Sequence, residues 1–444
     1  MLVAATLAAT LACAASPLDS PNVVLIVVDT LRPDHMSTYG YERKTTPNIS
    51  RLAQDSILFR NAWSTAPWTL PSVGSLLTSQ YPSALGIRDN IVPLDRRFEL
   101  LPEVLQRRGY RTHGIVSSAL LSARLGFGRG FDHYDESSSL FHSGSSSREV
   151  TRKAVEFLKA RDDRPFFLFL HYFDPHYNYE LHPRFRFGSG YRGRLRSGHS
   201  ILDLWRIRHQ LDAADLRFLV SLYDSEVAYT DESIGMLLDE LRVLGLYDDA
   251  LIVLTADHGE EFMERGWIGH SITLHREQLW IPFVIKLPDG EAREVESPIS
   301  TIDVVPSLYR QLGIDLPDGL EGRALPLDAV GAFAEVPIYG ETFNRQKHRR
   351  DPVERVALRS VSVGGLKLIA DEVTGRVVLF DLGDDPEERV DLASERADQV
   401  DRLQRLLGEW TEHVERKRNP DAPVPGQDLL TPEQRQQLKA LGYL

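Results

Sequence analysis

Apolar residues dominate three short segments of the chain. The first, Val23–Val28, lies between Pro21-Asn22 and Asp29 and is rich in β-branched residues. Phe166–Phe173 and Ala250–Thr255 have the same character. A short run that is apolar at nearly every position is typical of a strand buried on both faces. These segments therefore predict a parallel sheet covered by helices.

Helix-like stretches lie between these runs, among them Leu101–Arg108 and Ser225–Leu244, the latter with leucine and valine on one face. Strands that alternate with helices indicate an α/β fold, in which ligands bind at the carboxyl ends of the strands. Asp29, Asp174 and Asp257 all fall at such ends. We therefore expect functional carboxylates at this edge of the sheet.

The pattern changes after the loop-like stretch Gly313–Leu327. Short strand-like segments with glycine turns follow, which is typical of an antiparallel sheet. They are Arg355–Gly364, Leu366–Val373 and Arg376–Leu382, and helices are expected at Ala397–Lys417 and from Pro432 onward. The predicted organisation is a signal segment (1–20), a catalytic domain (21–330), a small C-terminal α+β subdomain carrying an antiparallel sheet (331–420) and a tail with a short helix (421–444).

The first residues indicate export. Met1–Ala12 is small and apolar and ends at Leu11-Ala12-Cys13, which resembles a bacterial lipoprotein signal with Cys13 as the lipidated residue. Cleavage by an ordinary signal peptidase near Ala12–Ala15, or a plain apolar N-terminus, are the alternatives. The run is shorter than the about 20 residues of a membrane-spanning helix. We expect an exported protein, in the bacterial periplasm or lipid-anchored to the membrane, attached to it only through Cys13.

Charge and composition narrow the partners. The net charge of −13 disfavours binding to a nucleic acid, so an anionic substrate requires a local positive site. The insertion Tyr179–His209 carries seven arginines and is either a lid that attracts such a substrate or a solvated surface loop. Cys13 is the only cysteine, which excludes an intramolecular disulfide and a cysteine metal cluster.

Thr69 is the first candidate for chemistry. It is followed by Leu70-Pro71, and prolines are common in the first turn of a helix, so Thr69 is expected to cap a helix. The positive end of the helix dipole favours a deprotonated hydroxyl and a nearby anion. Threonine also caps helices without any catalytic role, so this motif alone does not decide between the two.

Asp257-His258-Gly259 is the second candidate, because an aspartate and a histidine offer a carboxylate oxygen and an imidazole to a divalent metal. The same pair also occurs as simple turn chemistry. With Asp29 and Thr69, however, it would give one metal ion two carboxylates, one alkoxide and one imidazole. His176 and His270 would add donors for a bound oxyanion. Ca²⁺, Mn²⁺ and Zn²⁺ all suit such a ligand set.

Taken together, these motifs resemble the sulfatase family of the alkaline phosphatase superfamily over roughly residues 21–410. Thr69–Thr78 matches the spacing of the family signature Cys/Ser-x-Pro-Ser-Arg-x-x-Leu-Leu-Thr. The strand before Asp29, the Pro-His loop at Phe166–His176, the Asp257-His258-Gly259 motif and the Leu379–Leu392 segment also match. The resemblance implies an alkaline phosphatase-like fold with a large mixed, mostly parallel sheet sandwiched by helices.

The chain departs from the family signature at the residue that carries the chemistry. Family members convert the signature Cys or Ser to formylglycine, and Thr69 cannot be converted in this way. Val73 replaces the signature arginine, and Thr30 replaces the second aspartate of the usual opening pair. Threonine is the nucleophile in other superfamily members, among them phosphodiesterases, phosphoethanolamine transferases and lipoteichoic-acid synthases. The resemblance therefore implies one metal ion and no formylglycine.

The expected function is a metal-dependent ester hydrolase with Thr69 as the activated nucleophile, with phosphate-diester or phosphonate-type esters favoured. The alternatives are a sulfatase that works without formylglycine, a transferase of the phosphoryl group to an acceptor alcohol, and a binding protein without catalysis. The expected substrate is a small anionic ester, a glycan or a lipid head group.

Overall fold

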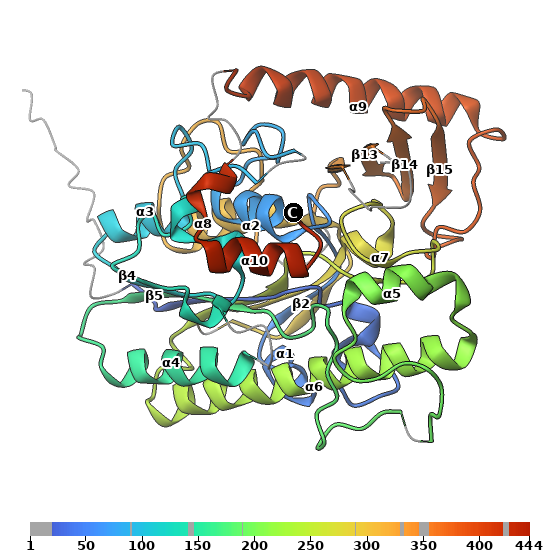
Figure 1. Ribbon diagram of the computed structural model, residues 1–444. Helices are drawn as coiled ribbons and strands as arrows, with labels where there is room; N and C mark the ends of the chain where they lie inside the picture. The colour runs from blue at the N-terminus through green and yellow to red at the C-terminus, as the bar shows by residue number, and fades with distance from the viewer. Residues whose placement is uncertain are drawn as a thin grey trace, which may run out of the picture.

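The computed structural model describes residues 20–444, except for 89–90, 141–145, 189, 289, 329–332, 346–354 and 421–425. The predicted signal segment and Cys13 lie outside the described residues. The largest element is a nine-stranded sheet with helices on both faces (Figure 1). Within the described residues, we find no helix with the length and apolar composition of a membrane span.

The three apolar runs form the centre of this sheet. β1 (Val23–Val28) lies between β5 (Phe166–Tyr172) and β6 (Leu251–Ala256) and is parallel to both. Every residue of β1 is fully buried. A strand with neighbours on both edges and helices on both faces has no solvated side, which explains why its sequence does not alternate between apolar and polar residues.

The outer strands make the sheet mixed. In order, the sheet runs β10-β2-β9-β6-β1-β5-β3-β4, and β11 pairs with β2. Only β9 is antiparallel to its neighbours, β2 and β6. The fold class, a mixed and mostly parallel sheet, is therefore confirmed. The outer strands are β2 (Ile57–Trp63), β3 (Arg111–Ile115), β4 (His133–Asp135), β9 (Trp280–Lys286), β10 (Arg293–Val295) and β11 (Ile299–Ser300).

Helices cover the sheet in two layers (Figure 1). One layer contains α2 (Thr69–Thr78), α3 (Leu101–Arg107) and α8 (Val304–Gln311), and the other contains α1 (Pro47–Ala53), α4 (Ser147–Lys159) and α6 (Ala213–Val243). All ten residues of α2 are buried. The helix expected at Ser225–Leu244 is the second half of α6, which begins earlier because Asp212 caps it at Ala213.

A second sheet of four antiparallel strands follows in the chain. It consists of β12 (Ile338–Arg345), β13 (Arg355–Val363), β14 (Leu366–Asp371) and β15 (Val377–Asp381), and α9 (Ala397–Lys417) lies over it. Leu368 of β14 packs with Leu407 and Trp410 of α9. The antiparallel pattern and α9 were predicted, whereas β12 was not. The domain boundary near residue 330 stays a prediction.

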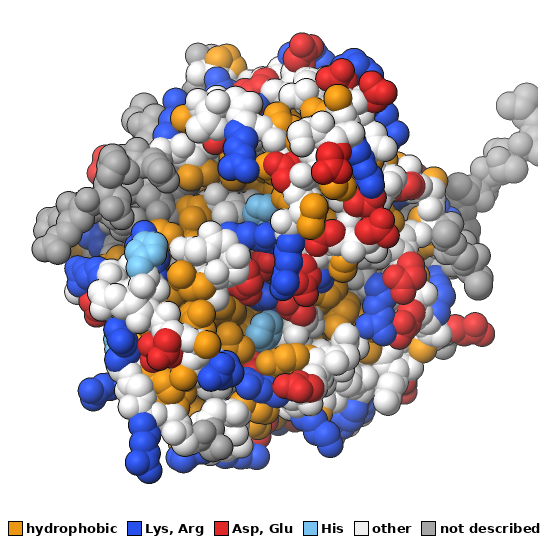
Figure 2. All heavy atoms as spheres, turned by 90° about the vertical axis from the view of Figure 1, so that its right-hand side faces the viewer, with side chains coloured by type: hydrophobic (Ala, Val, Ile, Leu, Met, Phe, Trp, Pro, Cys, Tyr) orange, Lys and Arg blue, Asp and Glu red, His pale blue; other side chains and the backbone are white. Residues whose placement is uncertain are grey.

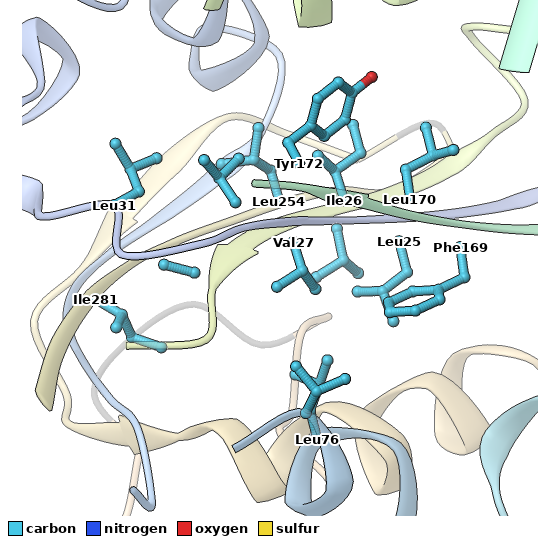
Figure 3. Packing of buried hydrophobic residues seen from close by; sticks show 14 of the residues in the cluster. Leu25, Ile26, Val27, Leu31, Leu76, Phe169, Leu170, Tyr172, Leu254 and Ile281 are labelled. Atoms are coloured by element: carbon cyan, nitrogen blue, oxygen red, sulfur yellow. The ribbon is translucent and has the colours of Figure 1, made fainter. Parts of the chain in front are cut away.

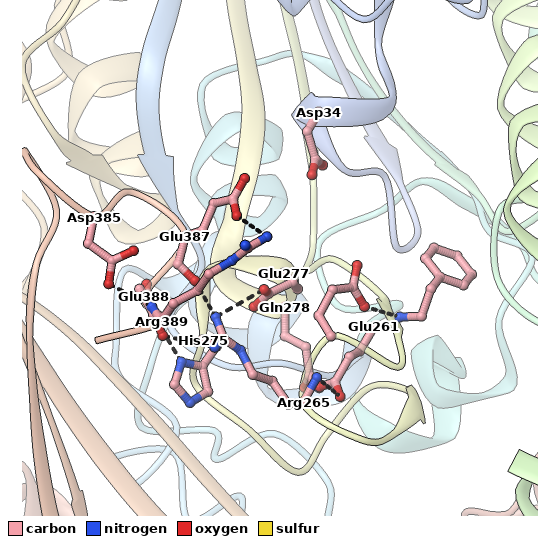
Figure 4. A network of polar contacts seen from close by, with 12 residues as sticks. Asp34, Glu261, Arg265, His275, Glu277, Gln278, Asp385, Glu387, Glu388 and Arg389 are labelled. Carbon is pink, nitrogen blue, oxygen red and sulfur yellow. Dashed lines mark hydrogen bonds and ion pairs between the residues drawn. The ribbon is translucent and has the colours of Figure 1, made fainter. Parts of the chain in front are cut away.

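Polar contacts join the second sheet to a loop of the first part of the chain (Figure 4). This loop connects β7 (Glu261–Phe262) to β8 (Ile268–Gly269), and its Arg265 donates to the carbonyl of Glu388, at 2.8 Å. The Glu388 carboxylate also meets His275 Nδ1 at 2.8 Å and the buried Lys367 ammonium at 2.7 Å. Because β8 leads directly into His270, these contacts hold the loop and strand that precede this predicted site residue.

Candidate active site

Four predicted residues meet at the carboxyl edge of the central strands. One carboxylate oxygen each of Asp29 and Asp257 and one ring nitrogen of His258 all lie within 4.8 Å of one another, close enough to hold one metal ion together. Thr69 Oγ1 lies 3.4 Å from Asp29 Oδ2 and 3.5 Å from His258 Nε2. The exposed fraction of these four side chains is at most 2%. The structure therefore brings together residues that are up to 229 positions apart in the chain (258 − 29).

Strand register places these groups on one face. Val27 is aligned with His171 of β5 and Thr255 of β6. The backbone ladder continues one step, because Asp29 N–H donates to the Tyr172 carbonyl at 2.8 Å. Alternate residues share a face, so Asp29 follows Val27 toward α2. Figure 3 shows this parity, with Leu25, Val27 and Phe169 pointing toward Leu76 of α2 and Ile26, Leu170 and Tyr172 pointing away.

The capping role expected of Thr69 is wrong. Trp68 is the N-cap of α2, no side chain caps this end, and Thr69 is the first residue of the helix. Its hydroxyl turns instead toward Asp29 and His258, away from the helix backbone. Helix capping therefore does not explain why a threonine occurs at this position. The Thr69 side chain is buried at the positive end of the α2 dipole.

The polar groups around Thr69 fit a divalent cation. Asp29 Oδ1 and Asp257 Oδ2 are buried without a hydrogen-bond partner among the described residues. Burial, and then the charges of Asp257 and Glu260, raise the pKa of Asp29 well above its usual value. Unpartnered buried carboxylate oxygens that repel one another are costly, and a bound cation removes both costs.

His171 was not predicted, although it lies beside this cluster. Its Nε2 is 3.6 Å from Asp29 Oδ2, and both ring nitrogens are buried with no hydrogen-bond partner in the described part of the chain. Burial lowers the pKa of His171 to about 4, so the ring is neutral at pH 7 and offers a lone pair, as a metal ligand must. His171 is placed beside Asp29 by the register of β5 against β1. This register cannot be read from a single sequence.

His176 and His270 lie together next to the cluster. Their ring centroids are 4.9 Å apart, and the His270 centroid is 4.4 Å from that of His258. His176 Nδ1 faces the Tyr177 carbonyl at 2.7 Å, and His270 Nδ1 faces Glu260 Oε1 at 2.8 Å. Burial lowers the pKa of both rings well below the usual value. The Nδ1 contacts leave the Nε2 atoms for other partners.

Tyr443 meets both of these Nε2 atoms and was not predicted. Its hydroxyl lies 2.6 Å from His270 Nε2 and 3.1 Å from His176 Nε2. The segment that carries it, Leu441–Leu444, follows α10 (Pro432–Ala440). No local motif marks this tyrosine, which lies 173 positions after His270 and 267 positions after His176, as a neighbour of the cluster.

Asp174, the third strand-end aspartate, lies outside this cluster of contacts. Its oxygens accept the backbone N–H groups of Ser146 and Ser147 at 2.5 and 2.7 Å. Ser147 is the first residue of α4, so Asp174 satisfies donors that a helix start leaves open. Its place at a strand end serves the local structure.

The arginines of the 179–209 insertion have mixed surroundings. Arg184 pairs with Glu232 at 2.6 Å, Arg206 with Asp203 at 2.7 Å, and Arg194 approaches Asp215 at 3.4 Å. Figure 2 shows Lys and Arg side chains scattered over the lower part of one face, interspersed with acidic groups. The lid stays a prediction, since local acidic partners account for several of these charges.

The chain is similar in sequence and in fold to several known hydrolases. The Sulfatase family model matches residues 21–314. An ulvan-active sulfatase of Formosa agariphila is 27% identical over 69% of this chain, which spans 64% of that relative's length. A multifunctional alkaline phosphatase superfamily protein of Trinickia caryophylli is 28% identical, with 85% of this chain and 92% of the relative covered. The phosphonate monoester hydrolase structure of Agrobacterium radiobacter superposes with a TM-score of 0.73 at 21% identity, covering 88% and 96% of the two chains.

Proposed function

Since this chain belongs to the sulfatase family of hydrolases, we propose that it cleaves an anionic ester with Thr69 as the metal-activated nucleophile, on phosphate-diester or phosphonate-type substrates. The observation that carries the proposal is the position of the Thr69 hydroxyl, buried between Asp29 and His258 at 3.4 and 3.5 Å. The Thr69 hydroxyl makes no capping hydrogen bond to the helix backbone, and it lies beside groups that can bind a metal ion. Such a hydroxyl is suited to act as a nucleophile.

Asp29, Asp257, His258 and Thr69 would hold the divalent ion, with His171 as an additional neighbour. A divalent cation supplies Lewis-acid stabilisation of negative charge and favours the ionised hydroxyl. Mn²⁺ and Zn²⁺ suit the two imidazoles, and Ca²⁺ suits the carboxylates. Elemental analysis of the purified protein identifies the ion.

In this proposal the Thr69 oxygen forms a bond to phosphorus while the bond to the leaving oxygen breaks. The product is a covalent Thr69 ester, which water then cleaves. His176 and His270 would line the leaving-group side. His270 Nδ1 faces the Glu260 carboxyl group, whose pKa burial raises well above its usual value, so the His270 ring can carry its proton on Nε2 and donate it to the departing oxygen. A threonine has no second hydroxyl on Cβ, so it cannot release sulfate by the collapse that formylglycine permits.

Hydrolysis of sulfate esters is the second candidate. It is supported by a relative named for sulfatase activity on ulvan, at 27% identity. In that case the Thr69 oxygen would form a bond to sulfur while the bond to the leaving alcohol oxygen breaks, and water would then hydrolyse the covalent sulfate ester. A sulfated or phosphorylated glycan would be the natural substrate class for such a protein.

The test is turnover of metal-loaded protein on aryl phosphodiesters, phosphonate monoesters and aryl sulfates. Thr69→Ala should lower kcat by about three orders of magnitude or more on the preferred class, because it removes the nucleophile. Thr69→Ser should keep part of the activity, since the hydroxyl remains.

Thr78→Ala is the matched control. Thr78 is a buried threonine of the same helix, and its hydroxyl donates to the Gly74 carbonyl at 2.7 Å. This control should retain wild-type activity. A Thr69→Ala variant as active as Thr78→Ala would show that the nucleophile assignment is wrong.

A further inference from the structure

The segment after α10 reaches the centre of the site. Besides the two histidine contacts of its hydroxyl, the Tyr443 ring lies over Trp68, with centroids 6.4 Å apart and planes at 29°. Trp68 immediately precedes Thr69. Tyr443 therefore lies between the residue next to the nucleophile and the two histidines expected on the leaving-group side. In Figure 1 the end of the chain, marked C, follows α10 and lies near α2, in agreement with the Trp68–Tyr443 ring contact.

This segment is built into the fold. Leu438 and Leu441 are buried in the main apolar core. Thr431 caps α10 by accepting the Gln434 N–H at 3.2 Å, and the Gln434 side chain donates to Ser122 Oγ at 3.2 Å. A segment that buries leucines and amide groups in this way does not detach at low cost. Tyr443 is thus held in a fixed position beside His176 and His270.

Gly442 and Leu441 fix the backbone conformation just before Tyr443. Gly442 has φ +81°, and a Cβ at this position would lie 2.7 Å from Trp205 Cη2. A residue with a side chain would be both strained and too close to the ring. The carbonyl of Leu441 accepts the Tyr177 hydroxyl at 3.2 Å. These contacts aim the phenol at His176 and His270.

Hydrogen-bond accounting indicates what the phenol does there. His176 Nδ1 faces a carbonyl oxygen, so it must carry a proton, and Nε2 of the neutral ring then has only a lone pair. A lone pair repels an anionic ester oxygen. Tyr443 has one hydroxyl proton, which in this structure faces the histidine lone pairs. An anionic oxygen that enters beside the hydroxyl is a stronger acceptor and takes this hydrogen bond. Burial raises the pKa of Tyr443 well above its usual value, which keeps it protonated.

We propose that Tyr443 is a substrate-binding residue, whose hydroxyl donates a hydrogen bond to an oxygen of the anionic ester group between His176 and His270. The proposal rests on the proposed function for the nature of that group, a tetrahedral phosphate, phosphonate or sulfate. It assigns part of the site to a segment outside the residues matched by the family model, which end at 314.

The experiment is calorimetric titration of metal-loaded protein with inorganic phosphate and with inorganic sulfate. Tyr443→Phe removes only the hydroxyl and should weaken binding roughly ten- to a hundredfold, the range for a hydrogen bond to a charged group. Its thermal midpoint should match that of the wild type. On any ester that is turned over, kcat/KM should fall by a similar factor.

Tyr247→Phe is the matched control, because its hydroxyl meets Asp55 at 3.0 Å, just before β6 begins and so at the opposite end of the strands. It should bind both anions like the wild type. Unchanged affinity in Tyr443→Phe, or no anion binding by the wild type, would overturn the proposal. So would faster turnover after deletion of residues 442–444, because Tyr443 would then be an obstruction. Absence of turnover on every ester counts against the proposed function alone, since anion affinity still decides the role of Tyr443.

Discussion

Asp29 and Asp257 illustrate how a buried site can be poised for a cation. Their side chains are 0% and 2% exposed, and each has an oxygen without a hydrogen-bond partner among the described residues. Glu260 adds a third buried carboxyl group whose charge raises the pKa of Asp29. In the absence of a cation this cluster opposes folding, and with one it favours folding.

Asp29→Asn tests this balance, because the substitution should stabilise the metal-free protein and destabilise the metal-loaded protein, each relative to the wild type in the same state. The variant removes one negative charge without changing the shape of the side chain, so the metal-free protein should melt at a higher temperature than the metal-free wild type. Added metal should stabilise the wild type by about 3–4 kcal/mol at a hundred to a thousand times the dissociation constant. Asp29→Asn should lose most of this gain. Thermal melts with and without a chelator measure both effects.

The contrary outcome is a metal-free variant that is less stable than the wild type and keeps the full metal-induced shift. Asp231→Asn serves as a control for the loss of a buried carboxylate elsewhere. Asp231 accepts backbone N–H groups at the start of α1, away from the residues of the cluster. This control should retain the metal-induced shift.

At the residue scale, sequence motifs identified the part of the site that lies in short, recognisable segments. Asp29, Thr69, Asp257 and His258 each sit at the end of a strand or the start of a helix, where the pattern itself marks a boundary. His171 lies inside an apolar run, and its role depends on the register between β5 and β1. Tyr443 depends on the path of a distant segment. Neither property is encoded in a local pattern.

At the scale of elements, continuous apolar runs predicted β1, β5 and β6 because complete burial leaves a strong signal. β12 was missed because the mixed pattern of this edge strand also suits a loop. β9 is apolar and lies inside the sheet, and it was missed because Pro282 argues against a central strand. The start of α2 was misjudged by one position. That single step decides whether Thr69 caps a helix or faces Asp29, and only the observed backbone distinguishes the two.

Packing of α1 against α6 carries a pH-dependent prediction. Burial raises the pKa of Asp231 on α6 from 3.8 to about 6, and the N–H groups of Asn48 and Ile49 only partly offset this shift. A raised pKa means that the folded state binds a proton that the unfolded state releases between about pH 4 and pH 6. The free energy of unfolding should therefore fall with rising pH across this window, by about 3 kcal/mol for this group.

Asp231→Asn removes the titration, so its stability relative to the wild type should increase from pH 4 to pH 6 and then stay constant. Denaturant unfolding at several pH values measures the difference, in which all other groups cancel. A stability difference that is independent of pH, or that falls over this range, would show that the N–H groups hold Asp231 ionised.

At the scale of the whole molecule, segments after residue 330 contact the loops and side chains that surround the candidate site. Glu388 and its partners fasten the loop that leads to His270 (Figure 4). Glu341 of β12 accepts the backbone N–H of Ser83 at 2.6 Å, just after α2. The tail that follows α9 supplies Tyr443. A division into a catalytic domain and an accessory sheet describes the chain order, whereas the site draws on both.

The sequence predicted this architecture through its resemblance to a family, and it predicted the antiparallel sheet from short strands and glycine turns. It contained no indication of how the second sheet and the tail return to the site. Such contacts arise from packing between segments far apart in the chain, which periodicity and motif spacing do not describe.

The most direct test of the account is to trap the covalent ester on Thr69. Metal-loaded protein turning over its preferred ester is quenched in acid and digested with trypsin, and the peptide between Arg60 and Arg88 is analysed by mass spectrometry. We predict that the added mass of the transferred group lies on Thr69 in the wild type and is absent in Thr69→Ala. An unmodified Thr69 during continued turnover, or the group on another residue, would contradict the account.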